Sequence, residues 1–107
     1  MSNEKTKINN VPTDEQIKAW KKEHGKVYKL TANGHVLIMR APLLVDLERA
    51  MASDPKKQKP FNFNRSIMNN CRLYESEGLS TDDSALAGIY GKMDEIVQIA
   101  EVELGEL

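Results

Sequence analysis

The chain has 107 residues, of which 40% are hydrophobic and 29% are charged, as expected for one ordinary globular domain. Its single cysteine, Cys71, excludes an internal disulfide and a zinc cluster built from thiolates. The formal net charge of −1 hides a division, because residues 1–74 contain 14 of the 15 Lys and Arg residues whereas residues 75–107 contain 9 of the 16 Asp and Glu residues. The basic and acidic segments can complement each other within one molecule or between copies, or they can attract a charged partner.

The first twelve residues show no periodicity and end at Pro12. The sequence therefore predicts a flexible arm over 1–12 and a single domain over 13–107. The polar start MSNEKTKINN is unlike a secretory signal, and no run approaches the roughly eighteen apolar residues of a membrane helix. We expect a soluble intracellular protein without membrane contact.

A short helix is predicted over residues 13–25. Thr13 can accept hydrogen bonds from the first turn, and Gly25 is placed as the C-terminal stop. Ile17 and Trp20 lie three residues apart and form one apolar stripe.

A β-hairpin is predicted over residues 26–40, KVYKLTANGHVLIMR, where apolar residues alternate with polar ones. Asn33-Gly34 favours a type I′ turn, because both central residues of that turn need a positive φ. The turn would pair Ala32 with His35 and continue through Leu30–Leu37 and Tyr28–Met39, which gives one apolar face and one mixed face. Two strands alone are rarely stable in water. Either helices of the same chain or a partner could cover the outer edges.

Two further helices follow the hairpin. In APLLVDLERAMASDP the apolar residues recur at helical spacing, with Pro42 in the first turn and Pro55 beyond the end, and they are Leu43, Leu44, Leu47, Ala50 and Met51. A linker bounded by Pro55 and Pro60 leads to FNRSIMNNCRLYE, which predicts a helix with the stripe Phe63, Ile67, Cys71 and Tyr74. Gly78 would end that helix.

The longest predicted helix covers residues 80–107, with Ser80 or Thr81 as its N-cap. Its apolar band comprises Leu86, Ile89, Tyr90, Met93, Ile96, Val97, Ala100 and Leu104. The predicted fold class is α+β, mostly helical, with one β-hairpin packed against about four helices.

The residues that could carry catalysis do not form a recognisable pattern. His24 and His35 lie at a helix end and beside a turn, and Cys71 lies on an apolar stripe, where we expect a buried, inert thiol. The neighbouring acids of Asp82-Asp83 and of Asp94-Glu95 point about 100° apart on a helix and do not converge. No serine or glycine motif of a hydrolase or phosphate loop is present. We expect no enzyme and assign no catalytic, cofactor-binding or metal-binding residue.

A basic cluster, formed by Lys56, Lys57, Lys59, Arg65 and Arg72, is the one feature that suggests nucleic acid. It lacks interleaved aromatic residues and is followed by an acidic segment. A solvated linker is therefore the preferred interpretation.

Protein binding is the remaining class of function. The outer strand edges of the hairpin could add a strand from a partner, and the apolar last turns of the predicted final helix could pack against a second copy. The protein's own helices could also cover either surface. The candidate protein-binding residues are Val36, Ile38 and Arg40 on the hairpin and Ile99, Val102, Leu104 and Leu107 near the end.

The order of these parts resembles small proteins encoded in the tail-gene region of tailed bacteriophages and prophages, which are described as tail-assembly-chaperone-like. The resemblance begins in IKAWKKEHGKVYKLTANGHVLIMRAP, with a Trp-Lys-Lys-x-x-Gly-Lys-Val-Tyr segment and a hairpin that closes on Arg-x-Pro. The matching residues are Trp20, Lys21, Lys22, Gly25, Lys26, Val27, Tyr28, Arg40 and Pro42. FNFNRSIMNNCRLYESEG and the acidic final helix are similar to versions in phages of gut bacteria.

The resemblance implies a protein that keeps the tape-measure protein soluble until tail-tube subunits polymerise around it. The expected function is that of a non-enzymatic assembly factor in the cytoplasm of the infected bacterial host, with self-association and with the tape-measure or tail-tube protein as partner. Two alternatives stay open, namely a structural component of the virion and a small nucleic-acid-binding phage protein.

Overall fold

In the part of the chain that the structure describes, four α-helices, one 3-10 turn and a three-stranded antiparallel sheet form an α+β fold, which confirms the predicted fold class. The computed structural model describes residues 11–53, 61–97 and 101–107. Most of the predicted arm and the Pro55–Pro60 linker therefore lie outside the described residues. In chain order the elements are α1 (Asp14–His24), β2 (Val27–Ala32), β3 (His35–Arg40), α2 (Leu44–Ser53), α3 (Asn62–Cys71), β4 (Arg72–Glu75), the 3-10 turn η1 (Leu79–Thr81) and α4 (Asp83–Ile96).

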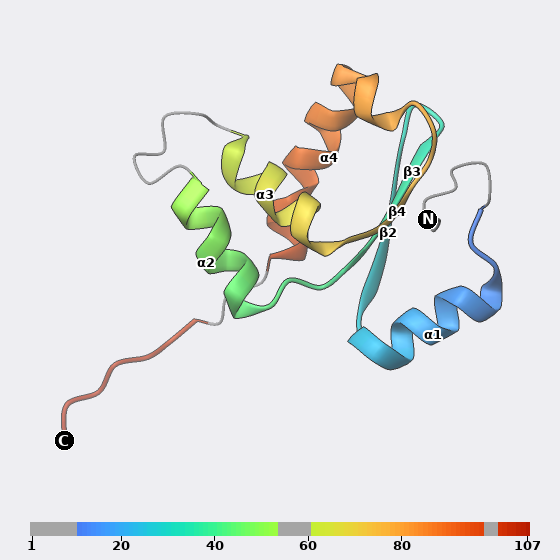
Figure 1. Ribbon diagram of the computed structural model, residues 1–107. Coiled ribbons are helices and arrows are strands. Elements are labelled where there is room, and N and C mark those ends of the chain that lie inside the picture. The colour runs from blue at the N-terminus through green and yellow to red at the C-terminus, as the bar shows by residue number, and fades with distance from the viewer. Residues whose placement is uncertain (1–10, 54–60, 98–100) are drawn as a thin grey trace.

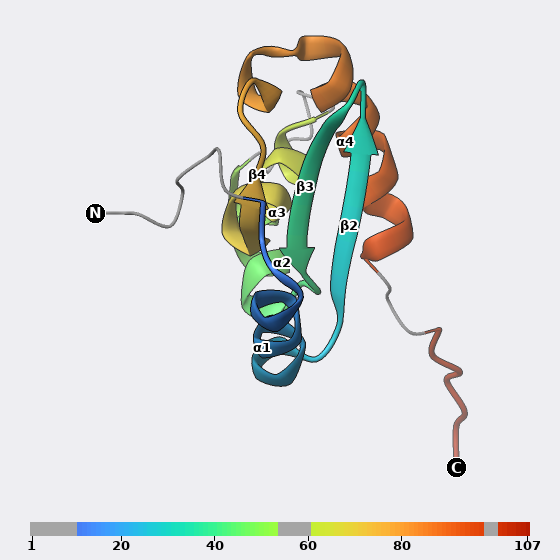
Figure 2. The same cartoon turned by 90° about the vertical axis from the view of Figure 1, so that its right-hand side faces the viewer.

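The sheet separates α1 from the other helices. Figure 1 shows α2, α3 and α4 on one side of the strands and α1 on the other side, and Figure 2 shows α1 in front of the lower end of the sheet. Thr13 accepts a hydrogen bond from the Gln16 N–H, and Gly25 ends α1 with a φ of 84°, as the sequence predicts. No helix in the described part of the chain is long and apolar enough to cross a membrane.

The hairpin has the predicted turn and register. Asn33 and Gly34 have φ values of 52° and 80°, as a type I′ turn requires. Tyr28 pairs with Met39, Leu30 with Leu37 and Ala32 with His35. The apolar face of the hairpin packs towards the helices and contributes to the core.

A third strand completes the sheet, and here the predicted helix over residues 63–75 is partly wrong. Helix α3 ends at Cys71, and Arg72–Glu75 forms β4, which pairs with β3 so that Tyr74 lies opposite Ile38. Pairing satisfies the backbone groups along the outer edge of β3, which would otherwise have to be covered. The order of strands is β2-β3-β4, so β2 is an edge of the sheet.

The predicted helix over residues 80–107 is shorter at both ends. Leu79–Thr81 forms η1, and Asp82 caps α4 by accepting a hydrogen bond from the Ala85 N–H, in place of Ser80 or Thr81. Helix α4 ends at Ile96, and residues 101–107 are exposed and without regular structure. The acidic residues after Met93 disfavour further helix, because negative charges near a helix C-terminus oppose its dipole.

The core lies between the sheet and helices α2, α3 and α4. Its largest fully buried apolar side chains are Leu37, Met39, Ile67, Leu79, Ile89 and Met93. Helix α2 differs from its predicted stripe, because Ala50 is buried whereas Leu43, Leu44 and Met51 are exposed. The helix instead buries the charged side chain of Asp46.

Candidate protein-binding groove

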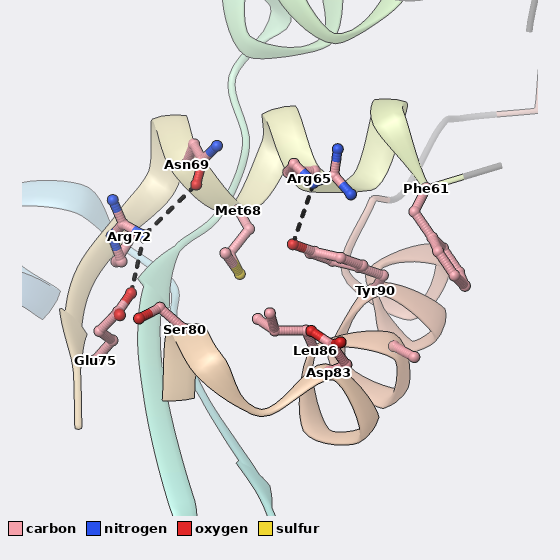
Figure 3. A pocket seen from close by; sticks show the side chains of 11 residues that line it. Phe61, Arg65, Met68, Asn69, Arg72, Glu75, Ser80, Asp83, Leu86 and Tyr90 are labelled. Carbon is pink, nitrogen blue, oxygen red and sulfur yellow. Dashed lines mark hydrogen bonds and ion pairs between the residues drawn. The ribbon is translucent and has the colours of Figure 1, made fainter. Parts of the chain in front are cut away.

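A groove of about 560 Å³ opens to the surface between α3 and α4 and reaches β4 and η1. Figure 3 shows its side chains, with Met68 pointing from α3 towards Leu86 of α4 and Tyr90 beside them. Met68 and Tyr90 are almost completely buried, so they form an apolar floor. The groove is further lined by Phe61, Arg65, Asn69, Arg72, Glu75, Ser80, Asp83 and Ala87.

Helical spacing accounts for the α3 side of the groove. Arg65 and Asn69 are four residues apart on α3 and therefore lie on one side of that helix, and Arg72 follows as the first residue of β4. Asn64 donates its side-chain N–H to the Tyr90 carbonyl over 2.7 Å and so joins α3 to α4. The distance between the two walls is therefore set by a hydrogen bond as well as by packing.

An aromatic cluster closes one end of the groove. The rings of Phe61 and Tyr90 lie 5.5 Å apart between centroids. The Arg65 guanidinium carbon is 5.6 Å from the centre of the Tyr90 ring, and Arg65 Nε donates to Tyr90 Oη over 3.4 Å. This geometry fits a cation–π contact, which holds the arginine over the apolar floor.

The opposite end of the groove is polar. Arg72 donates to Glu75 over 2.9 Å and to the side-chain oxygen of Asn69 over 3.5 Å. Asp83 lines the α4 side. Two arginines therefore face two carboxylates, so the formal charges of the lining cancel. A phosphate backbone requires an excess of positive charge, and this balance does not favour nucleic acid.

The composition of the lining is typical of a protein interface. Tyr, Phe, Met and Arg are enriched at protein interfaces, and Tyr and Arg are also enriched among the residues whose truncation weakens binding most. Within the described residues, no group of three or more His, Cys, Asp or Glu side chains is arranged to hold a metal ion. The arrangement can bind an amphipathic segment through its apolar floor and charged ends.

The structure does not bring the candidate residues of the hairpin together on one open surface. Val36 is half-buried, and its N–H donates to Ser76 Oγ over 2.8 Å. Ile38 is buried, although it lies on the face of the hairpin opposite the core residues Leu37 and Met39. Neither side chain offers a free apolar contact.

Arg40 serves to join elements within the fold. Its guanidinium donates two hydrogen bonds to the fully buried carboxylate of Asp46, over 2.7 and 3.2 Å, and a third to the Asn70 carbonyl. The hydrogen bond from Arg40 and the N–H of Leu43 hold the pKa of Asp46 below its ordinary value despite burial. The same hydrogen bond raises the pKa of Arg40. This ion pair links the end of β3 to α2 and to α3.

Cys71 lies beside that ion pair, with Sγ 3.6 Å from Asp46 Oδ2. Burial raises the pKa of the thiol to about 12, and the nearby Asp46 carboxylate adds to the effect while Arg40 opposes it. The thiol is therefore protonated at neutral pH and is a poor nucleophile. The prediction of a buried cysteine is confirmed.

The remaining sequence candidates lie apart from the groove or outside the described residues. Val102, Leu104 and Leu107 are fully exposed, with no contact to the core, and Ile99 is outside the described part. Of the basic cluster, Arg65 and Arg72 line the groove, whereas Lys56, Lys57 and Lys59 are outside the described part.

Sequence reasoning missed the groove. The available signal was the spacing of Arg65 and Met68 on α3, with Phe61 just before this helix and Arg72 just after it. The opposing wall depends on how α4 packs against α3, which the spacing within one helix does not reveal.

Comparison with known proteins adds no relative. No family model, no curated protein and no solved structure matches the chain.

Proposed function

We propose that this protein is a non-enzymatic assembly factor of a tailed phage, which binds another viral protein in the cytoplasm of the host. The observation that carries the proposal is the α3–α4 groove, whose apolar floor is bounded by Arg65 with Tyr90 at one end and by Arg72 with Glu75 at the other. The resemblance to tail-assembly-chaperone-like proteins supplies the class of partner, which is the tape-measure or tail-tube protein.

The groove favours an amphipathic helix as the bound segment. Phe61, which is exposed, and Leu86, which is half-buried, offer apolar contacts to one stripe of such a helix above the buried floor of Met68 and Tyr90. Arg65 lies near the edge of the floor and is exposed, so it can pair with an acidic residue beside that stripe. Tape-measure proteins are long and helical. Covering their apolar stripes reversibly requires a binding surface and no catalysis.

The test is co-expression with the tape-measure and tail-tube proteins of the phage that encodes the chain, followed by affinity purification. We expect one of them to co-purify with the parent protein. Ala87→Tyr would fill the groove from the exposed side of α4 and should weaken binding at least tenfold, which corresponds to about 1.4 kcal/mol.

Ser84→Tyr is the matched control, because Ser84 is exposed on the same helix and is not among the residues that line the groove. It should leave co-purification unchanged. Loss of binding in both variants, or in neither, would reject the groove as the site. Recovery of neither viral protein with the parent chain would reject the proposed function.

Mass spectrometry of purified phage particles separates the proposal from a structural role. An assembly factor that acts reversibly should be absent from mature particles. The presence of the chain in many copies per particle would instead assign it to the virion.

A further inference from the structure

The outer edge of β2 has backbone groups available for another strand. The Ala41 N–H donates to the Lys26 carbonyl, and hydrogen-bonded pairs alternate along an antiparallel ladder. The residues that bond to β3 are therefore Lys26, Tyr28, Leu30 and Ala32. The N–H and C=O groups of Val27, Lys29 and Thr31 point away from β3, and β2 has no second neighbouring strand among the described residues.

A second groove, of about 420 Å³, runs along this edge between β2 and α4. Its β2 wall includes Tyr28 and Leu30, and its α4 wall includes Ile89 and Ile96, which belong to the core. Gly88 also lines the groove, and a side chain added there would meet open space. The missing side chain leaves room beside the strand edge for the side chains of an added strand.

The segment formed by residues 101–107 has the pattern of a strand that fits this edge. Its first four residues, Glu-Val-Glu-Leu, alternate acidic and apolar side chains, which is the period of a β-strand. Val102 and Leu104 are 86% and 97% exposed, and neither packs against the core formed by the described residues. Seven residues also match the six residues of β2 in length.

We propose that residues 101–107 of a second copy pair with β2 as a fourth strand. With Val102 and Leu104 directed into the groove against Leu30 and Ile89, the alternate side chains Glu101 and Glu103 emerge on the opposite face of the sheet. Lys29 is exposed on that face, so the added strand brings opposite charges together.

The donor is assigned to another molecule because of where the segment lies. In Figures 1 and 2, residues 101–107 extend away from the sheet and do not pair with β2 of their own chain. Two copies that exchange these segments form a closed dimer, whereas one-way donation forms a longer chain of copies. Both arrangements satisfy the same backbone groups of Val27, Lys29 and Thr31.

Light scattering during size-exclusion chromatography tests the inference with the full chain. We expect concentration-dependent association that Gly88→Leu weakens at least tenfold, because the new side chain occupies the groove. Gly91→Leu is the matched control, since Gly91 also faces open space on α4 but does not line the groove. Both substitutions replace an exposed helical glycine, so both should preserve the fold.

Charge-reversal variants then identify which molecule supplies residues 101–107 to β2. Lys29→Glu and Glu103→Lys should each weaken association, because each places like charges side by side. A mixture of the two variant proteins should recover it, because each copy then meets a complementary partner. Exchange between copies is supported if association recovers in the mixture and if Gly88→Leu weakens association whereas Gly91→Leu does not.

Three outcomes would overturn the proposal. The parent chain could remain monomeric at all concentrations, the Gly88→Leu and Gly91→Leu variants could behave alike, or mixing the charge variants could fail to restore association. The last result, with a stable monomer, would indicate that the segment pairs with β2 of its own chain.

Discussion

At the scale of single residues, the Arg40–Asp46 pair determines how three elements meet. Asp46 is fully buried, and it accepts hydrogen bonds from Arg40, from the Leu43 N–H and from the Cys71 thiol. A buried carboxylate is tolerated only when such partners compensate for its lost hydration. The sequence shows Arg40 as part of a hairpin and Asp46 as a polar residue within an apolar stripe, and their spacing alone does not reveal that they pair.

Asp46→Asn should destabilise the fold by about 3 kcal/mol, because it leaves the Arg40 guanidinium without its ionic partner. The amide keeps the shape of the side chain and one acceptor oxygen for the Leu43 N–H. Urea unfolding measures the change. Glu48→Gln, which removes an exposed carboxylate from the same helix, should change stability by less than about 0.5 kcal/mol. Equal effects of the two substitutions would show that the pair is not important for stability.

Stability should fall in acid because two carboxyl groups have lowered pKa values. Arg40 lowers the pKa of Asp46, and the Ala85 N–H followed by the Asn33 side chain lowers that of Asp82. A group with a lowered folded-state pKa stabilises the fold fully above its ordinary value, here 3.8, and loses that contribution as the pH falls through the folded-state pKa.

Thermal unfolding midpoints should therefore decrease below about pH 4 from these two groups. Asp82→Asn should reduce that decrease, because asparagine keeps the helix cap without a titrating group. His35 Nε2 lies 3.3 Å from Asp82 Oδ2, so His35→Gln serves as the control in the same titration. An unchanged pH profile in Asp82→Asn would contradict the assigned role of Asp82.

At the scale of elements, local sequence signals were sufficient to predict the hairpin and helix α1, but they were insufficient to predict strand β4. The turn residues Asn33 and Gly34 determine the hairpin register, and Thr13 and Gly25 mark the ends of α1. Residues 72–75 carry both a helical stripe and strand-forming side chains, and the open edge of β3 decides between them. Such a long-range choice is not encoded in the spacing of Arg72–Glu75 alone.

The junction of β3 with β4 offers a test at this scale. Val36 donates its N–H to Ser76 Oγ, and Ser76 donates its own N–H to the Val36 carbonyl over 2.9 Å. Ser76→Ala removes only the first of these bonds, so unfolding free energy should decrease by about 1 kcal/mol. Ser80→Ala, on an exposed turn nearby, should have less than half that effect. Equal decreases in unfolding free energy for the two variants would contradict a stabilising role of the hydrogen bond between Val36 and the Ser76 side chain.

At the scale of the whole molecule, α4 separates two grooves. The α3–α4 groove lies on one side of this helix, and the groove beside β2 lies on the other. Ala87 and Gly88 are neighbours in sequence yet line different grooves, which allows each surface to be blocked alone. The sequence predicted the apolar residues of α4. Which of the two grooves a residue of α4 lines depends on how the helix packs against α3 and against the sheet, and the sequence did not reveal that packing.

Hydrogen–deuterium exchange of the chain with and without the proposed viral partner tests the central claim most directly. Binding at the α3–α4 groove predicts slower exchange in residues 62–72 and 83–90, with little change along α1. Slower exchange confined to α1 or to the exposed side of α2, or none in any segment while the partner is bound, would contradict the assignment of the groove as the protein-binding site.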